Sequence, residues 1–153
     1  MKIHIIGGSG SGKTTLAQRL AKDYGIQHYD LDELNWDNSS DAYGIKRDKA
    51  ERAEMLDKIL QKSDWIIEGV YYEWCRQCFE DADRIYLLKV PRRSYRSRII
   101  RRFIRRKLGL EKGKKETFAS LKALLKWADK YQKEDIPKIR RLLQPYRDKV
   151  VEL

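Results

Sequence analysis

The chain has 153 residues, of which 41% are hydrophobic and 37% are charged, and its formal net charge is +11. This length suffices for one domain with a buried core, and the apolar stretches are far too short to cross a membrane. The positive excess could serve a polyphosphate substrate, a nucleic-acid backbone or simple solubility. The first residues lead into glycines and not into a long apolar segment, which argues against a secretory signal, so we expect a cytoplasmic protein without a membrane partner.

Short apolar runs alternate with segments of helical spacing along the whole chain. The predicted strands cover residues 2–6, 26–30, 65–67, 85–88 and 149–153. The predicted helices cover residues 14–24, 48–62, 115–132 and 136–143, another begins at Pro91, and residues 36–44 form a loop. This alternation indicates an α/β fold with a parallel sheet and helices on both faces, and we expect a single domain over residues 1–153.

A glycine-rich segment follows the first predicted strand and opens the first predicted helix. It fits the pattern Gly-x-x-x-x-Gly-Lys-Ser/Thr, in the strand–loop–helix setting that this phosphate-binding motif requires. Backbone N–H groups then bind phosphate oxygens, Lys13 reaches the β- and γ-phosphates from an exposed position, and the Thr14 hydroxyl binds Mg²⁺. We predict a site for ATP or GTP with Mg²⁺, in preference to a turn without ligand. Its residues are Gly7, Gly8, Ser9, Gly10, Ser11, Gly12, Lys13, Thr14 and Thr15.

Acidic residues follow the next two predicted strands. Asp30 and Asp32 point the same way if the second strand continues that far, at the sheet edge where open α/β folds bind ligands. We expect Asp30 to hold a Mg²⁺-bound water and Asp32 to act on an acceptor hydroxyl; the alternative is that one of them caps a helix beginning near Leu34. Glu68 resembles the carboxylate of a Walker B motif and Gly69 could let a substrate approach, whereas the alternative is a solvated strand end.

Aromatic residues flank the same predicted crevice and could stack on a base or a sugar, with ordinary packing as the alternative for each ring. Lys46 and Arg47 could contact an anionic acceptor, or simply be exposed residues at the start of a helix. The residues that we predict to bind the acceptor are Asp32, Trp36, Glu68, Gly69 and Tyr71.

The segment from residue 92 to residue 115 is strongly basic. Its apolar residues fall at helical spacing on one stripe: Tyr95, Ile99, Ile100, Phe103, Ile104 and Leu108. Its arginines fall mainly on the other faces: Arg98, Arg101, Arg102, Arg105 and Arg106. They could form a lid over the γ-phosphate, contact nucleic-acid phosphates, or solvate a surface helix. We favour the lid, because a phosphate-binding loop requires charge neutralisation nearby, and choose Arg98 and Arg102 as its catalytic residues.

Two cysteines, Cys75 and Cys78, form a Cys-x-x-Cys pair in a segment of helical character. The chain has no further cysteine to complete a tetrahedral zinc site, and its two histidines lie in other predicted strands. We therefore expect neither a zinc site nor a redox function at this pair.

Three segments together resemble the small adenylate-kinase-like P-loop proteins, and among these most closely the proteins labelled DNA topology modulation proteins. These segments are Gly7 to Thr14, His28-Tyr29-Asp30-Leu31-Asp32 and Trp65-Ile66-Ile67-Glu68-Gly69-Val70-Tyr71. The resemblance extends along the whole chain and implies a five-stranded parallel sheet in the order 2-3-1-4-5 with a mobile helical lid. Shikimate and gluconate kinases carry a similar Asp-x-Asp, which implies phosphate transfer to a small acceptor.

These observations predict a Mg²⁺-dependent kinase that transfers the γ-phosphoryl group of ATP to a nucleoside, a nucleotide or a small metabolite. One alternative is a nucleotide-dependent protein that binds nucleic acid through the basic helix and affects DNA topology. Another is a slow nucleoside triphosphatase without an acceptor. DNA affinity that falls steeply with salt and responds to ATP would favour the first alternative.

Overall fold

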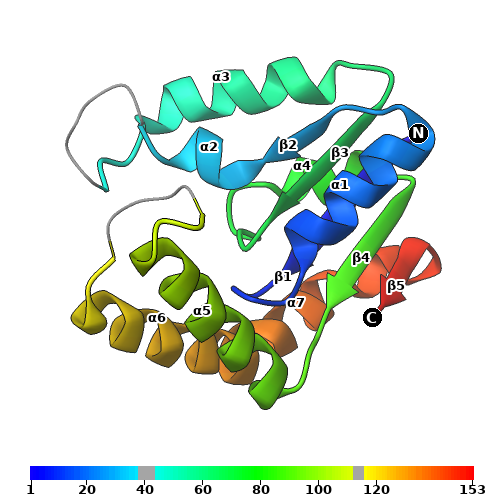
Figure 1. Ribbon diagram of the computed structural model, residues 1–153. Coiled ribbons are helices and arrows are strands. Elements are labelled where there is room, and N and C mark those ends of the chain that lie inside the picture. Colours follow the sequence, from blue (N-terminus) through cyan, green and yellow to red (C-terminus); the bar gives the residue numbers. More distant parts are fainter. Residues whose placement is uncertain (38–43, 112–115) are drawn as a thin grey trace.

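A five-stranded parallel sheet forms the centre of the computed structural model, which describes residues 1–37, 44–111 and 116–153 (Figure 1). The strand order is β2-β3-β1-β4-β5, as the resemblance implies, and every neighbouring pair is parallel. The strands are β1 (Lys2–Gly7), β2 (His28–Asp30), β3 (Trp65–Gly69), β4 (Arg84–Leu88) and β5 (Val150–Glu152). The predicted α/β fold class is therefore confirmed.

Helices cover both faces of this sheet. They are α1 (Lys13–Tyr24), α2 (Leu31–Asn35), α3 (Lys49–Leu60), α4 (Arg76–Asp81), α5 (Arg92–Lys107), α6 (Phe118–Lys130) and α7 (Ile136–Leu142). Alternate residues of β1 point to opposite faces, so Ile3 and Ile5 pack in the core with Leu20 of α1, whereas Ile6 packs in the core with Phe79 and Ile139. None of the helices in the described ranges is long and apolar enough to span a bilayer.

The register of the sheet brings three loop-bearing strand ends together. Asp30 pairs with Glu68 across β2 and β3, and Ile6 pairs with Gly69 across β1 and β3. The carboxyl end of β1 therefore lies next to that of β3, with the acidic end of β2 beyond it. In Figure 1, α2 and α3 lie on one side of these strand ends, and α5 and α6 lie on the other.

Several predicted boundaries differ from the structure. The second strand ends at Asp30 and the chain enters α2 at Leu31, so Asp32 does not continue the strand. Residues 38–43 of the predicted loop and the start expected at Lys115 lie outside the described residues. The helix α6 begins at Phe118, because Thr117 and Ser120 cap each other's backbone N–H groups. A π-helical turn (Tyr131–Asp135) joins α6 to α7, and a 3₁₀ helix (Gln144–Lys149) precedes β5.

The helix α5 buries a narrower stripe than its sequence predicts. Tyr95, Ile99 and Phe103 are buried and pack on or near α6, whereas Ile100, Ile104 and Leu108 are exposed. Residues four apart form a single row, and the apolar contacts of α5 with α6 involve that row. The predicted six-residue stripe is therefore wrong in its outer half. The part of the predicted lid at residues 112–115 lies outside the described residues.

The two cysteines lie in the core and not in the crevice. Both are free and buried, Cys75 directly before α4 and Cys78 within it. The thiol of Cys75 donates a hydrogen bond to the backbone oxygen of Tyr71 at 2.9 Å. This contact ties the start of α4 to the segment that follows β3.

Candidate active site

A large cavity of about 1530 Å³ lies at the carboxyl ends of the strands. Of the residues predicted to form the site, all but three line it: Ser9, Gly10, Gly12, Lys13, Thr14, Thr15, Asp30, Asp32, Trp36, Glu68, Gly69, Tyr71, Arg98 and Arg102. The exceptions are Gly7 and Gly8, which are buried, and Ser11. Ser11 lines a second cavity of about 420 Å³, together with Thr15, Arg19 and Arg98.

The glycine-rich loop has a backbone that only glycine adopts readily. Gly10 has φ of 75° and Gly12 has φ of 99°, both in the left-handed region. A Cβ at Gly10 would lie only 2.7 Å from the backbone oxygen of Tyr95, so α5 also presses closely against the loop. No side chain caps the start of α1 at Lys13, which leaves its first N–H groups for an anion.

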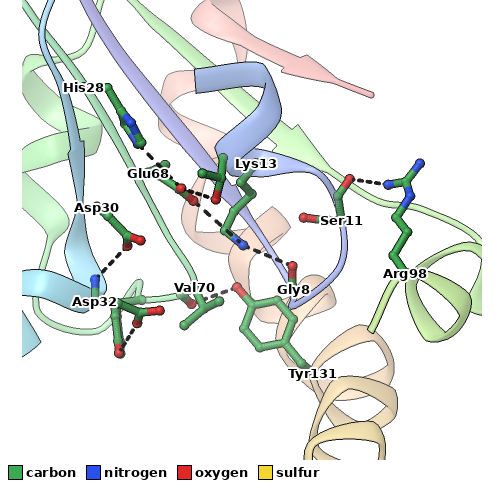
Figure 2. A network of polar contacts seen from close by, with 12 residues as sticks. Gly8, Ser11, Lys13, His28, Asp30, Asp32, Glu68, Val70, Arg98 and Tyr131 are labelled. Atoms are coloured by element: carbon green, nitrogen blue, oxygen red, sulfur yellow. Dashed lines mark hydrogen bonds and ion pairs between the residues drawn. The ribbon is translucent and has the colours of Figure 1, made fainter. Parts of the chain in front are cut away.

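Lys13 is buried, contrary to the exposed position predicted for it. Its side chain folds back under the loop, and its Nζ donates to the backbone oxygen of Gly8 at 3.1 Å (Figure 2). Glu68 Oε2 lies 4.0 Å from the Nζ of Lys13. Burial lowers the pKa of Lys13, although Glu68, Asp32 and Asp30 oppose the shift. The loop thus holds the lysine between its own backbone and three carboxylates.

Glu68 lies at the centre of the polar network in Figure 2 and is almost wholly buried, so the alternative of a solvated strand end is wrong. Thr14 Oγ1 donates to Glu68 Oε1 at 2.5 Å, and His28 Nε2 lies 3.5 Å from the same oxygen. Burial acts to raise the pKa of Glu68, but His28, Lys13 and Thr14 together outweigh it and hold that pKa below its usual value. Glu68 is therefore ionised at neutral pH.

The oxygen atoms next to the loop suit a magnesium ion. Within the described ranges, no three His, Cys, Asp or Glu residues form a metal cluster by themselves. Thr14 and Glu68 nevertheless offer a hydroxyl and a carboxylate in direct contact, and Asp30 pairs with Glu68 in the sheet. Mg²⁺ takes few protein ligands and completes its octahedron with phosphate oxygens and water, so this donor set fits the ion.

The two aspartates differ in their surroundings. Asp30 Oδ1 accepts a hydrogen bond from the backbone N–H of Asp32 at 2.8 Å and caps α2, as the alternative interpretation proposed, although this helix begins at Leu31. Burial raises the pKa of Asp30 to about 6; the N–H of Asp32 opposes the shift and the charges of Glu68 and Asp32 support it. Asp32 is exposed toward the cavity, and its Oδ1 accepts a hydrogen bond from the Tyr71 hydroxyl at 2.7 Å.

Aromatic rings line the side of the cavity that is predicted to bind the acceptor. The centroids of Tyr71 and Trp74 lie 5.2 Å apart, and Trp36 is held by an antiparallel bridge to Lys46. A Cβ at Gly69 would lie 2.9 Å from two Leu31 side-chain atoms. This glycine is therefore required for packing against α2, whether or not a substrate approaches it.

Arg47 has a structural position. Its Nε donates to the backbone oxygen of Leu34 at 3.2 Å, one Nη donates to that of Trp36 at 3.3 Å, and the other donates to Glu51 at 2.6 Å. These bonds tie the chain before α3 to α2. They leave the guanidinium occupied by the protein itself, so Arg47 is not available to an acceptor in this structure.

Three arginines of α5, one turn apart, face the strand ends. Arg98 Nη1 donates to the backbone oxygens of Ser11 at 2.9 Å and Gly10 at 3.2 Å, so it touches the loop and lines both cavities. Arg102 lines the main cavity, and burial lowers the pKa of its guanidinium, as does the neighbouring Arg106. Arg106 also lines the cavity and pairs with Glu116 at 2.8 Å.

Several residues that line the cavity are not among the predicted site residues. Arg106 continues the four-residue spacing from Arg98 through Arg102, which was a usable signal. Arg52 lies four residues before the buried Leu56 of α3, so a cation falls on the apolar face of this helix. That placement was a second usable signal. Tyr131 had no such signal: its place depends on the π-helical turn, where its hydroxyl donates to the backbone oxygen of Val70 at 2.8 Å (Figure 2).

The chain has recognisable relatives among known proteins. The model of the protein family described as "AAA domain" matches residues 3–119. "Uncharacterized protein YqaC" of Bacillus subtilis (strain 168) is 29% identical over 130 residues, which is 84% of this chain and 71% of that protein.

Solved structures show the same fold. A shikimate kinase from Acinetobacter baumannii in complex with shikimate is 20% identical, with a TM-score of 0.55 over 99% of this chain and 80% of that one. A gluconokinase from Sinorhizobium meliloti 1021 is 15% identical, with a TM-score of 0.53 over 99% of this chain and 81% of that one. At this level of identity the likeness concerns the fold.

Proposed function

The chain belongs to the family described as "AAA domain", and on this premise we propose that it is a Mg²⁺-dependent phosphotransferase that moves the γ-phosphoryl group of ATP or GTP to a small acceptor. One observation carries the proposal. The phosphate-binding loop with Lys13, the carboxylates Glu68 and Asp32, and Arg102 all line a single cavity of about 1530 Å³. A cavity of this size exceeds what one drug-sized ligand requires, so a nucleotide and an acceptor fit side by side.

The donor is held by the loop and α1. The uncapped N-terminus of α1 binds phosphate oxygens, and Lys13 turns from the Gly8 carbonyl to the β- and γ-phosphates. Thr14, with Asp30 and Glu68 through water, would hold Mg²⁺, and the ion would neutralise charge on the phosphates. The second cavity adjoins the loop beside Thr15 and suits the nucleoside part of the donor.

The acceptor approaches from the side of Asp32. Its hydroxyl oxygen attacks the γ-phosphorus while the bond from that phosphorus to the bridging oxygen breaks, which releases the nucleoside diphosphate. The hydroxyl proton passes to the Asp32 carboxylate, which Tyr71 orients through its hydrogen bond. Arg102 stabilises the charge that spreads over the oxygens of the transferring group.

An acceptor screen tests this function. We would incubate the protein with Mg²⁺, ATP or GTP and a panel of nucleosides, nucleotides, polyols and sugar acids, and measure nucleoside diphosphate release and phosphorylated product. At least one acceptor should raise diphosphate release well above background and gain one phosphoryl group, and Lys13→Ala should abolish both. Diphosphate release that no acceptor raises would instead identify a slow nucleoside triphosphatase.

A second candidate function is nucleotide-dependent binding of nucleic acid, which would agree with the label DNA topology modulation. The net charge of +11 favours it, and Arg93 and Arg101 are exposed on α5. Most other arginines of this helix are engaged: Arg92 and Arg96 pair with Asp129, and Arg98 binds the loop. DNA binding that falls steeply with salt and depends on ATP would favour this candidate.

A further inference from the structure

One arginine on the acceptor side is fixed in place by neutral groups. Arg52, on the first half of α3, stacks on the ring of Trp74 with its guanidinium carbon 4.2 Å from the ring centroid. Its Nη1 donates to Asn35 Oδ1 at 3.0 Å. In the part of the chain that the structure describes, no carboxylate lies within ion-pair distance of Arg52. The guanidinium has five N–H donors, so most of them remain after these contacts.

Other cations around the cavity are already engaged by protein groups. Lys13 contacts a backbone oxygen and lies near Glu68, Arg98 binds two backbone oxygens, and Arg106 pairs with Glu116. Arg102 faces the transferring group in the proposed reaction. Arg52 differs from all of these, because it lies on the proposed acceptor side and has a fixed orientation with no acidic partner among the described residues. Lys46 and Lys49, which line the same cavity, add positive charge.

An aromatic pair connects Arg52 to the proposed catalytic carboxylate. The hydroxyl of Tyr71 donates to Asp32, and the neighbouring ring of Trp74 carries Arg52 on its face. The two rings come from the segment between β3 and α4, so they form one wall with a carboxylate at one end and a guanidinium at the other. A ligand lying along this wall meets a proton acceptor and an anion-binding group at the same time.

We propose that the acceptor carries an oxyanion, a carboxylate or a phosphate, that Arg52 binds, while its hydroxyl group lies at Asp32. The planar guanidinium matches either oxyanion with two parallel hydrogen bonds. This inference rests on the proposed function and narrows its acceptor class: sugar acids and nucleotides are favoured over polyols and nucleosides. Arg52 is a specificity residue in this scheme, and the transfer itself proceeds at Asp32.

Direct binding of matched probe pairs tests the inference without turnover. The pairs are gluconate and glucitol for a carboxylate, and AMP and adenosine for a phosphate, measured by calorimetry with Mg²⁺ and a non-hydrolysable ATP analogue. At least one anionic probe should bind more tightly than its neutral partner, and Arg52→Gln should weaken that probe by roughly 10- to 100-fold. The pair that responds identifies the oxyanion. Arg52→Lys, which keeps the charge but loses the fork, should give an intermediate loss and serves if Arg52→Gln does not fold.

The control is Arg76→Gln, which removes an exposed arginine on α4 that is paired with Glu80. It should bind every probe as the parent does. Equal affinity of anionic probes in the parent and in Arg52→Gln, or no binding of any anionic probe, would overturn the inference. If neutral acceptors are phosphorylated and Arg52→Gln turns them over normally, this inference fails while the phosphotransferase stands. If Arg52 binds an anion but no acceptor is phosphorylated, the proposed function fails and the anion site stands.

Discussion

The proposed donor and acceptor sides of the cavity are built in different ways. The donor side consists mainly of one continuous segment, residues 7–15, whose backbone turns at Gly10 and Gly12 and continues into α1. The acceptor side gathers single side chains from three separate places: Asp32 from α2, Arg52 from α3, and Tyr71 from the segment after β3. Backbone geometry therefore governs one side, and long-range packing of side chains governs the other.

This difference has a consequence for function. A backbone cradle binds what all nucleoside triphosphates share, namely their phosphates, and so it tolerates change in the rest of the protein. A set of side chains on separate elements can change one residue at a time, so acceptor selectivity can change while the fold and the donor site remain. Substitutions on the two sides should therefore differ in their effects on nucleotide binding, on turnover and on stability.

Lys13→Ala should have the largest effect, because it removes the one charged side chain of the loop that reaches the phosphates. We expect nucleotide binding and turnover to fall below detection, measured by calorimetry with Mg²⁺ and by diphosphate release. The fold should persist, because the pKa of Lys13 is lowered by burial, which means that its charge is unfavourable in the empty protein. Lys22→Ala, an exposed lysine in the last turn of α1, is the control. Undiminished ATP affinity in Lys13→Ala would contradict the donor site.

Arg102→Ala should lower turnover by about 10³-fold, by analogy with arginines that stabilise a transferring phosphoryl group. ATP affinity should change far less, since this contact strengthens mainly in the transition state. The adjacent Arg101→Ala is a matched control, because Arg101 is exposed and does not line the cavity. If both variants keep full turnover but lose salt-sensitive DNA affinity, the basic helix binds nucleic acid instead.

Asp32→Asn should lower turnover by about 10²-fold, the range of a lost general base, and leave nucleotide affinity nearly unchanged. Tyr71→Phe should have a smaller effect of the same kind, since it removes only the hydrogen bond at 2.7 Å that orients the carboxylate. Single-turnover rates at saturating nucleotide measure both. If Asp32→Asn instead lost ATP binding while its single-turnover rate stayed unaltered, Asp32 would belong to the donor site and not to the acceptor site.

The fold was predictable because local sequence governs most of it. β-branched runs buried on both faces indicate parallel strands, and the pattern of residues 7–14 fixes where β1 must end and α1 begin. The errors concern places where distant contacts or caps decide. Asp30 ends β2 early because its side chain caps α2, and Thr117 delays α6.

The candidate site was predictable on its donor side and less so on its acceptor side. The sequence of the loop contains the whole phosphate cradle, but the burial of Lys13 depends on the neighbouring strands and was predicted wrongly. Glu68 was recognised as a strand-end acid, although its contacts with Thr14 and His28 require the register of the sheet. Arg52 is placed by Trp74 and Asn35, which lie 22 residues after it and 17 residues before it (74 − 52 and 52 − 35), so only its position on a helix face hinted at a site.

The smallest expected effect concerns the brace that holds α5 against α6. Asp129 accepts hydrogen bonds from Arg92 at 2.7 Å, Arg96 at 2.7 Å and the Tyr95 hydroxyl at 2.6 Å. These contacts, with Arg92 and Tyr95 foremost, lower the pKa of Asp129 to about 2. The lowered pKa means that the ionised carboxylate stabilises the fold above the ordinary value of 3.8, and that this stabilisation is lost as the pH falls toward 2.

Asp129→Asn should therefore reduce the free energy of unfolding by about 1 kcal/mol at pH 7, a figure already reduced for the partial exposure of the group. About half of this difference should remain at pH 3. Urea unfolding of variant and parent between pH 3 and pH 7 measures it, with Asp148→Asn as the control, since Asp148 is 95% exposed. A difference that stays constant with pH would show that shape and not charge holds the two helices together. Because Tyr95 lies against Gly10, a loosened brace should also lower turnover slightly, which would place α5 on the donor side as a rigid part of the loop's support.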